Sequence, residues 1–292
     1  MHVLVHGGAG RTPEEPEQRQ TDLEKAATQG ADEPGSVDAV ESAVRHLESA
    51  PRFNAGVGGA RQSDGVVRTD AGLMTGAGDN GAACSMPGIE HAVSVARAVM
   101  EETPHVLLAG EHAVRFGQAT GVAVERTLLT DRSRERWGEY DPPPGLLDQL
   151  AAVRERFGSE DATGDDPLEH DTVGAVATDG DTVAAATSTG GRWFALAGRV
   201  GDVPQVGAGF YASGDAAASA TGEGEAIARF GLARDVVERI EDGVPPGRAT
   251  DRGLQAFEDD TDGRAGVIAI RATGDAGSAY NTDAMSTAYR GS

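Results

Sequence analysis

The segment His170-Asp171-Thr172-Val173-Gly174-Ala175-Val176-Ala177 separates two stretches of very different character. Before it, residues of the 130–171 region are polar, charged and rich in helix breakers, which predicts a mobile linker around one short amphipathic helix. From Thr172 onward, β-branched and small apolar residues follow without a break and predict a buried strand. A second such run, residues 183–188, comes after Asp179-Gly180-Asp181, a turn sequence typical of a β-hairpin. We therefore expect a hairpin whose first strand begins at Thr172.

Around this hairpin, strands and helices come in blocks rather than in strict alternation. Further strands are expected at residues 3–5, 267–270 and 280–289, and helices at 36–50, 92–100, 105–116 and 224–243. The first of these helices has Ser36 as its N-cap, and its apolar residues recur at helical spacing. Blocks of this kind are typical of layered α+β proteins.

The composition predicts a globular protein with an unusual charge. The chain has 292 residues, enough for one large or two small domains, and 39% of them are hydrophobic. Its formal net charge of −22 argues against a surface for nucleic acid or anionic membranes. Lys25 is the only lysine, so every other cation is arginine. An acidic, lysine-poor surface indicates adaptation to high salt, where screening removes self-repulsion; an ordinary acidic cytosolic protein is the alternative.

Cysteine usage and the N-terminus bear on the cellular compartment. Cys84 is the only cysteine, which excludes an intramolecular disulfide and a cysteine metal cluster. The first residues enter a strand-like run without a basic n-region or cleavage site. No apolar stretch approaches the roughly 20 residues that span a bilayer. We expect a soluble, cytoplasmic protein.

The position of Thr172 suggests a chemical role. A threonine that begins a strand is usually only a good β-former, and this remains the simpler interpretation of the residue alone. Its hydroxyl becomes an effective nucleophile when a base lies beside it, and the residue's own α-amine is one such base. That amine has a pKa of about 7.7–8.0 and is partly neutral near physiological pH. It must first be released by cleavage of the preceding peptide bond, and a linker ending at Thr172 would tolerate that cleavage.

Ordered motifs along nearly the whole chain strengthen this hypothesis. Outside the 130–170 linker they are His6-Gly7-Gly8-Ala9-Gly10, residues 53–58, residues 102–106, residues 170–177, Ala184-Ala185-Ala186-Thr187-Ser188-Thr189-Gly190-Gly191, residues 198–202, residues 206–212 and Thr221-Gly222-Glu223-Gly224-Glu225. Together they resemble the N-terminal-nucleophile asparaginase family, which comprises plant-type L-asparaginases with isoaspartyl peptidase activity, glycosylasparaginases and taspases. The resemblance implies an α+β fold, a four-layer αββα sandwich with Thr172 at the start of one strand.

The resemblance also implies self-cleavage between Asp171 and Thr172. The Thr172 hydroxyl would attack the Asp171 carbonyl, and hydrolysis of the resulting ester would separate the chain. The products are an α subunit, residues 1–171, and a β subunit, residues 172–292, which stay folded together as one domain.

Other matching positions acquire expected roles. Thr189 would orient the Thr172 hydroxyl, with Thr187 as the alternative. Arg199 would bind the substrate α-carboxylate through a bidentate guanidinium, and Asp202 would bind the α-ammonium; a surface ion pair is the usual role of such residues taken singly.

The oxyanion site is expected from a second group of residues. Thr221 and Gly222 would form the oxyanion hole, and Asn54 would position the substrate amide. A phosphate-binding loop is the alternative interpretation of residues 221–224, but the lysine of a P-loop is missing.

The family resemblance implies a structural ion and an assembly. In the family, the loop corresponding to residues 47–57 wraps a structural sodium ion through backbone carbonyls, here those of Leu47, Glu48, Ala50, Phe53, Ala55 and Val57. A plain helix-to-loop bend is the alternative, and His2 and His6 are expected to be core or surface residues rather than metal ligands. No organic cofactor is required. The expected partners are a small amino acid or dipeptide substrate and a second copy, giving a homodimer of αβ units, with no nucleic acid and no membrane.

Three departures from the family's sequence pattern and two motifs bear on substrate specificity. Residues 192–195 alter the pocket rim, Thr75 replaces a common aspartate, and Glu223 adds charge near the oxyanion site. His170-Asp171 is more like glycosylasparaginases, whereas residues 187–191 and the N-terminal motif are more like plant-type enzymes.

We favour hydrolysis of L-asparagine and β-aspartyl dipeptides. The alternatives are a glycosylasparaginase, a non-catalytic binding protein on the same fold, and a nucleotide-binding module.

Overall fold

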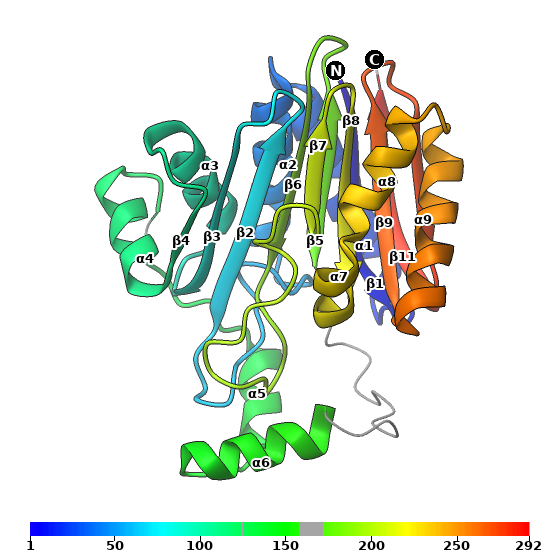
Figure 1. Cartoon of the computed structure of the whole chain (residues 1–292). Coiled ribbons are helices and arrows are strands. Elements are labelled where there is room, and N and C mark those ends of the chain that lie inside the picture. The colour runs from blue at the N-terminus through cyan, green and yellow to red at the C-terminus, as the bar shows by residue number, and fades with distance from the viewer. Residues whose placement is uncertain (124, 158–171, 292) are drawn as a thin grey trace.

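The computed structural model describes residues 1–123, 125–157 and 172–291. Two β-sheets lie face to face, and helices cover both outer faces (Figure 1). The elements in chain order are β1 (His2–Gly10), α1 (Pro16–Ala31), α2 (Ser36–Ser49), β2 (Arg68–Thr75), β3 (Asn80–Pro87), α3 (Ala92–Glu102), β4 (Leu107–Ala109), α4 (Gly110–Ala119), α5 (Asp131–Gly138), α6 (Leu146–Phe157), β5 (Val173–Thr178), β6 (Val183–Thr189), β7 (Phe210–Ser213), β8 (Ala216–Gly222), α7 (Gly224–Phe230), α8 (Leu232–Glu241), α9 (Pro246–Thr261), β9 (Ala265–Arg271), β10 (Ala276–Tyr280) and β11 (Ala284–Gly291).

The strand order places the expected hairpin at the centre of the larger sheet. Within the described residues this sheet runs β11-β1-β5-β6-β2-β3-β4, and the smaller sheet runs β10-β9-β8-β7. β5 and β6 pair antiparallel, as the turn sequence predicts, and Gly180 in the turn has φ of 100°. β1 and β2 flank the hairpin, so its strands are covered at both edges.

Three buried layers hold the sandwich together. One lies between the larger sheet and α1 to α4, a second between the two sheets, and a third between the smaller sheet and α7 to α9. Alternation along β5 explains the first two, because Val173 and Ala175 face the helices while Val176 faces the smaller sheet. The expected α+β four-layer αββα sandwich is confirmed.

Three expected elements and one expected cap differ from the structure. The single helix expected at 224–243 is divided into α7 and α8 at Gly231, which has φ of 81° and ends the first of them. The N-cap of α2 is Gly35 rather than Ser36, whose hydroxyl bonds the Thr182 hydroxyl instead.

The start of the helix expected at 105–116 is instead β4, because Leu107, Leu108 and Ala109 extend the sheet by pairing parallel with β3. The single strand expected at 280–289 is divided: β10 is an edge strand of the smaller sheet, and β11 is an edge strand of the larger sheet. Here the chain crosses between layers, a long-range arrangement that local pattern does not encode.

The expected linker contains two helices in its described part. α5 begins at a capping box in which the Ser133 amide donates to the Thr130 hydroxyl and the Thr130 amide donates to the Ser133 hydroxyl. α6 follows, and both lie beyond one end of the sandwich (Figure 1). The cleavage position before Thr172 and residue Asp171 lie outside the described residues. No helix among the described residues has the length and apolar character needed to cross a membrane.

Candidate active site

Three neighbouring strands of the larger sheet bring Thr172, Thr189 and Asp70 into one row. The register of β5 and β6 sets Val173 opposite Ser188, and one further step places Thr172 opposite Thr189. β6 and β2 set Thr189 opposite Asp70. Opposite residues share a face of the sheet, here the face that packs on the smaller sheet. Both threonines are buried, each with 5% of its surface exposed.

A second polar layer lies one row deeper between the sheets. His6 Nε2 and Thr187 Oγ1 both bond the Ser219 hydroxyl, at 2.8 and 2.7 Å, and Thr187 also donates to the Gly209 carbonyl at 2.8 Å. Gly174 lies opposite both His6 and Thr187, and a Cβ atom there would overlap the His6 ring and the Ser219 hydroxyl. Thr187 is therefore one row away from Thr172, while Thr189 is directly opposite it.

His6 is a neutral ring near the Thr172 backbone. It is completely buried, and burial lowers its pKa to about 3, against the opposing effect of the nearby Thr172 backbone. At neutral pH the imidazole therefore carries no charge between the sheets.

The second sheet supplies Thr221 and Gly222. Thr221 is buried at the end of β8, and its Oγ1 accepts a hydrogen bond from the Ala9 amide of β1 at 3.4 Å. This contact joins the two sheets at β1, the strand that pairs with β5 directly after Thr172. Gly222 has φ of 138°, and a side chain there would overlap the backbone of Arg264 and Ala265. The position accepts only glycine because two backbones approach closely.

Arg199 and Asp202 meet beside the same loop. A Cβ atom on Gly224 would lie 2.7 Å from Arg199 Nη2 and 2.8 Å from Asp202 Oδ1. Glu225 accepts from Arg199 Nε at 2.8 Å and Nη2 at 2.7 Å, a bidentate pair that fixes the guanidinium plane. Asp202 is 4% exposed, and its buried Oδ2 has no hydrogen-bond partner among the described residues. The site thus presents a fixed cation next to a carboxylate with an unused acceptor.

Burial raises the pKa values of two carboxyl groups in this region to about 7. Asp202 is one, and the charge of Arg199 acts against the shift. Asp70 is the other, although its Oδ1 accepts from the Ser85 amide at 2.6 Å. Asp70 also interacts electrostatically with Arg199, so it links the threonine row to the Arg199–Asp202 pair. Sequence reasoning gave no site role to Asp70, Glu225 and Ser219, and it expected His6 only as a core or surface residue. Residue spacing alone gave no signal for the long-range contacts that bring them here.

Asn54 connects the loop before β2 to the end of β6. Its Nδ2 donates to the Gly191 carbonyl at 2.6 Å, and its Oδ1 accepts from the Ala60 amide at 2.8 Å. Its backbone carbonyl accepts from the Gly190 amide at 2.7 Å. The side chain therefore holds backbone next to Thr189, and the expected contact with a substrate amide stays a prediction.

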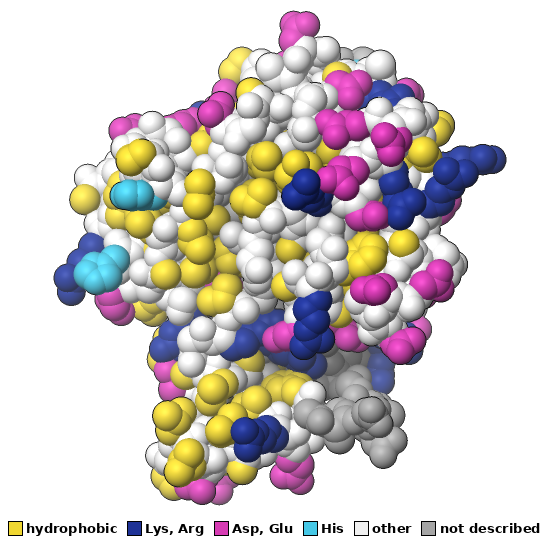
Figure 2. Space-filling model, in the orientation of Figure 1, with side chains coloured by type: hydrophobic (Ala, Val, Ile, Leu, Met, Phe, Trp, Pro, Cys, Tyr) yellow, Lys and Arg dark blue, Asp and Glu magenta, His cyan; other side chains and the backbone are white. Residues whose placement is uncertain are grey.

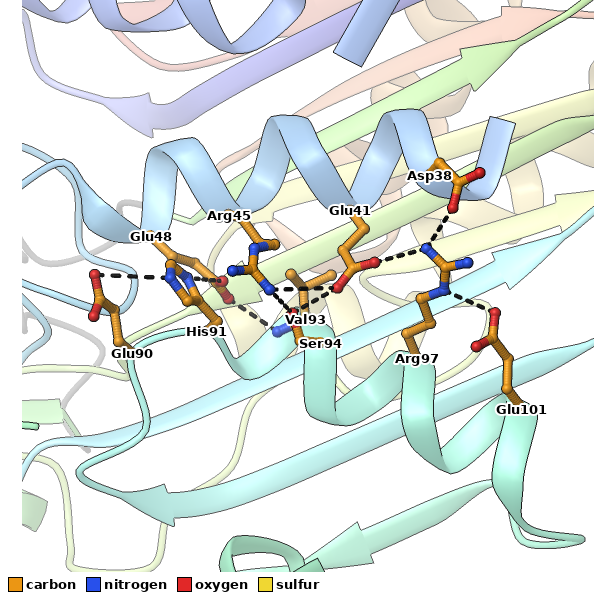
Figure 3. Close-up of polar contacts among 10 residues, drawn as sticks. All are labelled: Asp38, Glu41, Arg45, Glu48, Glu90, His91, Val93, Ser94, Arg97 and Glu101. Atoms are coloured by element: carbon orange, nitrogen blue, oxygen red, sulfur yellow. Dashed lines mark hydrogen bonds and ion pairs between the residues drawn. The ribbon is translucent and has the colours of Figure 1, made fainter. Parts of the chain in front are cut away.

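The opposite face of β6 rests on a buried carboxylate. Glu48, at the end of α2, is completely buried, and its Oε1 accepts from Ser188 Oγ at 2.6 Å and from the Val93 amide at 3.0 Å. His91 Nδ1 lies 3.4 Å from Oε2. Figure 3 shows Glu48, His91 and Val93 at one end of a line of polar contacts between α2 and α3 that continues to Arg97. Glu48 thereby ties the helix layer to the residue before Thr189.

In the loop expected to bind sodium, backbone amides donate to backbone carbonyls of the same loop. The Val57 amide donates to the Glu48 carbonyl at 2.8 Å, and the Phe53 amide donates to the Ala50 carbonyl at 3.2 Å. A Cβ atom on Gly56, which has φ of 55°, would overlap the Glu48 and Glu90 carbonyls. The Glu48 and Glu90 carbonyls therefore lie close together here. The carbonyls of Leu47, Glu48 and Ala50 already accept backbone hydrogen bonds, and the expected sodium ion stays a prediction.

Comparison with known proteins shows the family of this chain. The family model described as Asparaginase matches residues 1–292. A plant-type L-asparaginase of Pyrococcus horikoshii is 37% identical over 98% of this chain and 95% of that protein. A plant-type L-asparaginase of Pyrobaculum calidifontis is 40% identical over 98% of this chain and 96% of its own length. An isoaspartyl peptidase/L-asparaginase of Xenopus laevis is 37% identical over 98% of this chain and 91% of its own length.

Proposed function

Because this chain belongs to the asparaginase family and is a hydrolase, we propose that it is a self-processing amidohydrolase that acts on L-asparagine and β-aspartyl dipeptides through Thr172. The observation that carries the proposal is the row of Thr172, Thr189 and Asp70 beside Arg199 and Asp202. The names of the relatives favour these substrates over glycosylated asparagine.

Self-cleavage creates the base that the reaction needs. The Thr172 hydroxyl attacks the Asp171 carbonyl, the acyl group moves from nitrogen to oxygen, and water hydrolyses the ester. The new α-amine of Thr172 then takes the proton from its own hydroxyl. Thr189, directly across the strand pair, supplies a hydroxyl that orients this group.

Substrate recognition follows from the charges of the pocket. Glu225 occupies Nε and Nη2 of Arg199, so the Nη1 edge binds the substrate α-carboxylate. The unused Oδ2 of Asp202 accepts from the α-ammonium. Thr172 Oγ attacks the side-chain amide, Thr221 and Gly222 stabilise the oxyanion, and ammonia or an amino acid leaves with the proton from the α-amine. Water then cleaves the acyl-enzyme and releases aspartate.

Intact mass tests this mechanism first. The purified chain, incubated in concentrated salt, is expected to separate into residues 1–171 and 172–292, while Thr172→Ala stays whole. The mature enzyme should then hydrolyse L-asparagine and a β-aspartyl dipeptide faster than a glycosylated asparagine. A single uncut chain at every salt concentration and pH tried would overturn the mechanism and favour a non-catalytic binding protein.

The ion and the assembly belong to the same proposal. The carbonyls of residues 47–57 bind a structural sodium ion, and two αβ units associate as a homodimer. Replacing potassium by sodium at constant ionic strength is expected to raise the melting temperature. Sedimentation should give the mass of two αβ units. The mass of a single αβ unit would contradict the homodimer.

A further inference from the structure

The helices that precede the cleavage position rest on an aromatic cluster from the other side of it. Tyr140 lies 4.1 Å and Trp137 6.0 Å from the Phe194 ring, measured between ring centroids. The Arg136 guanidinium lies 4.5 Å from the Trp193 ring, and that of Arg156 lies 4.6 Å from the Phe194 ring. Cation–π contacts of this length are attractive even near the surface. The contacts join the future α subunit to the future β subunit.

Phe194 has a backbone conformation that needs such support. Its φ is 58°, in the left-handed region that bulky residues avoid, and its side chain is buried. A strained residue of this kind persists only where its surroundings hold it in place. Here the ring is held by α5, α6 and the residue between them, Tyr140.

The strained turn is five residues before Arg199, and hydrogen bonds connect the two. Ser63 Oγ donates to Gln149 of α6 at 2.9 Å and accepts from the Ala197 amide at 3.0 Å. The neighbouring Gln62 donates to the Arg199 carbonyl at 2.9 Å and accepts from the Gly198 amide at 2.8 Å. The loop after β6 reaches toward α5 (Figure 1). The docked helices and the backbone of Arg199 therefore belong to one connected structure.

We propose that α5 and α6 remain docked after cleavage and that Arg136 and Arg156 act as positioning residues, which keep the Phe194 turn, and through it Arg199, in place for the substrate carboxylate. This inference rests on the proposed function. Because Arg199 would grip the substrate in both the ground state and the transition state, a displaced Arg199 should raise KM more than it lowers kcat.

The test is the double variant Arg136→Ala/Arg156→Ala in the full chain, after self-cleavage. We expect KM for L-asparagine to rise about fivefold to tenfold and kcat to stay within about twofold, with self-cleavage unchanged. The matched control is Arg154→Ala, an exposed arginine of α6, which should keep the wild-type KM. A double variant with the KM of the control would overturn the inference.

Two variants at Phe194 distinguish an effect of the strained turn on KM from a general destabilisation of the fold. Glycine adopts a φ of 58° without strain, whereas alanine is strained there, so Phe194→Ala should raise KM more than Phe194→Gly. Equal KM values would show that the strained turn does not matter for Arg199.

Hydrogen exchange keeps the inference independent of the activity. Exchange at residues 194–199 should increase in the double variant and not in Arg154→Ala. Unchanged exchange would overturn the inference even if the wild type hydrolysed asparagine, whereas an inactive wild type with the expected exchange would overturn only the proposed function.

Discussion

The unused oxygen of Asp202 has a direct consequence for pH dependence. Burial raises the pKa of this carboxyl to about 7, so it becomes fully ionised only above neutrality. In the proposed mechanism an ionised Asp202 binds the substrate ammonium and a protonated one does not, so KM for L-asparagine should rise as the pH falls from 8 to 6. Asp202→Asn should raise KM about 10- to 100-fold at pH 8, the cost of losing a charged hydrogen bond.

Kinetics across pH check this prediction. The pH dependence of KM should be much weaker in Asp202→Asn than in the wild type. Asp215→Asn is the control, because its side chain is 59% exposed. A variant that retained the full wild-type pH profile would assign the titration to another group.

Asp70 permits a prediction for stability. Its folded pKa is about 7, whereas the ordinary value is 3.8. Between these values the folded chain holds a proton that the unfolded chain has released, so stability falls as the pH rises through this interval. Asp70→Asn cannot ionise, and its amide oxygen can still accept from the Ser85 amide. Between pH 5 and pH 8 the wild type should lose about 2 kcal/mol more than the variant.

Urea unfolding at the two pH values measures this difference. The Asp215→Asn chain should follow the wild type. Parallel pH dependences of wild type and Asp70→Asn would mean that Asp70 ionises normally in the folded protein.

At the scale of elements, Glu48 joins α2, α3 and β6. Glu48→Ala leaves the Ser188 hydroxyl and the Val93 amide without their acceptor, both in the interior. We expect a loss of about 2–4 kcal/mol of unfolding free energy. Glu48→Gln retains an acceptor oxygen and should lose less. The measurement is urea unfolding. Glu101→Ala is the control, because the i,i+4 ion pair of Glu101 with Arg97 at the surface is worth about 0.5 kcal/mol or less. Equal losses in Glu48→Ala and Glu101→Ala would refute the buried role.

The hairpin of β5 and β6 shows what the sequence could predict. Its alternation and its turn are local signals, and they predicted both strands; β5 begins at Val173, one residue after the expected Thr172. The same register then places Thr189 opposite Thr172. Asp70 could not be found in this way, because β2 reaches β6 from more than 100 residues away in sequence. Neither could Glu48 be assigned, since its acceptor role depends on the packing of α2 beneath β6.

The segment before Thr172 marks another limit of local pattern. Its prolines and charges predicted a linker around one helix, but α5 and α6 both fold in the described part. Arg136 and Arg156 in this segment lie over aromatic rings. Residues 192–195, noted only as an altered rim, provide two of those rings. Such pairing becomes visible only when distant residues meet.

At the scale of the whole molecule, the main feature is the excess of negative charge. The formal net charge is −22, and Figure 2 shows many acidic side chains on the drawn face, with arginines among them. Ion pairs connect some of the charged side chains of the molecule, such as Arg97 with Asp38, Glu41 and Glu101 on α2 and α3. The excess of negative charge still repels itself in the folded state, and more strongly than in the expanded unfolded chain.

Salt should therefore stabilise the folded protein. The screening length falls from about 10 Å at 0.1 M to about 3 Å at 1 M salt. We expect the melting temperature to rise by at least about 5 °C between 0.1 M and 2 M potassium chloride, since 1 kcal/mol corresponds to about 2–4 °C in a chain of this size. Tetramethylammonium chloride at equal ionic strength should give most of the same rise below 1 M, where screening acts without a specific cation site. A melting temperature independent of salt would mean that the arginine pairs already neutralise the acidic surface, and an ordinary acidic protein would then be the better description.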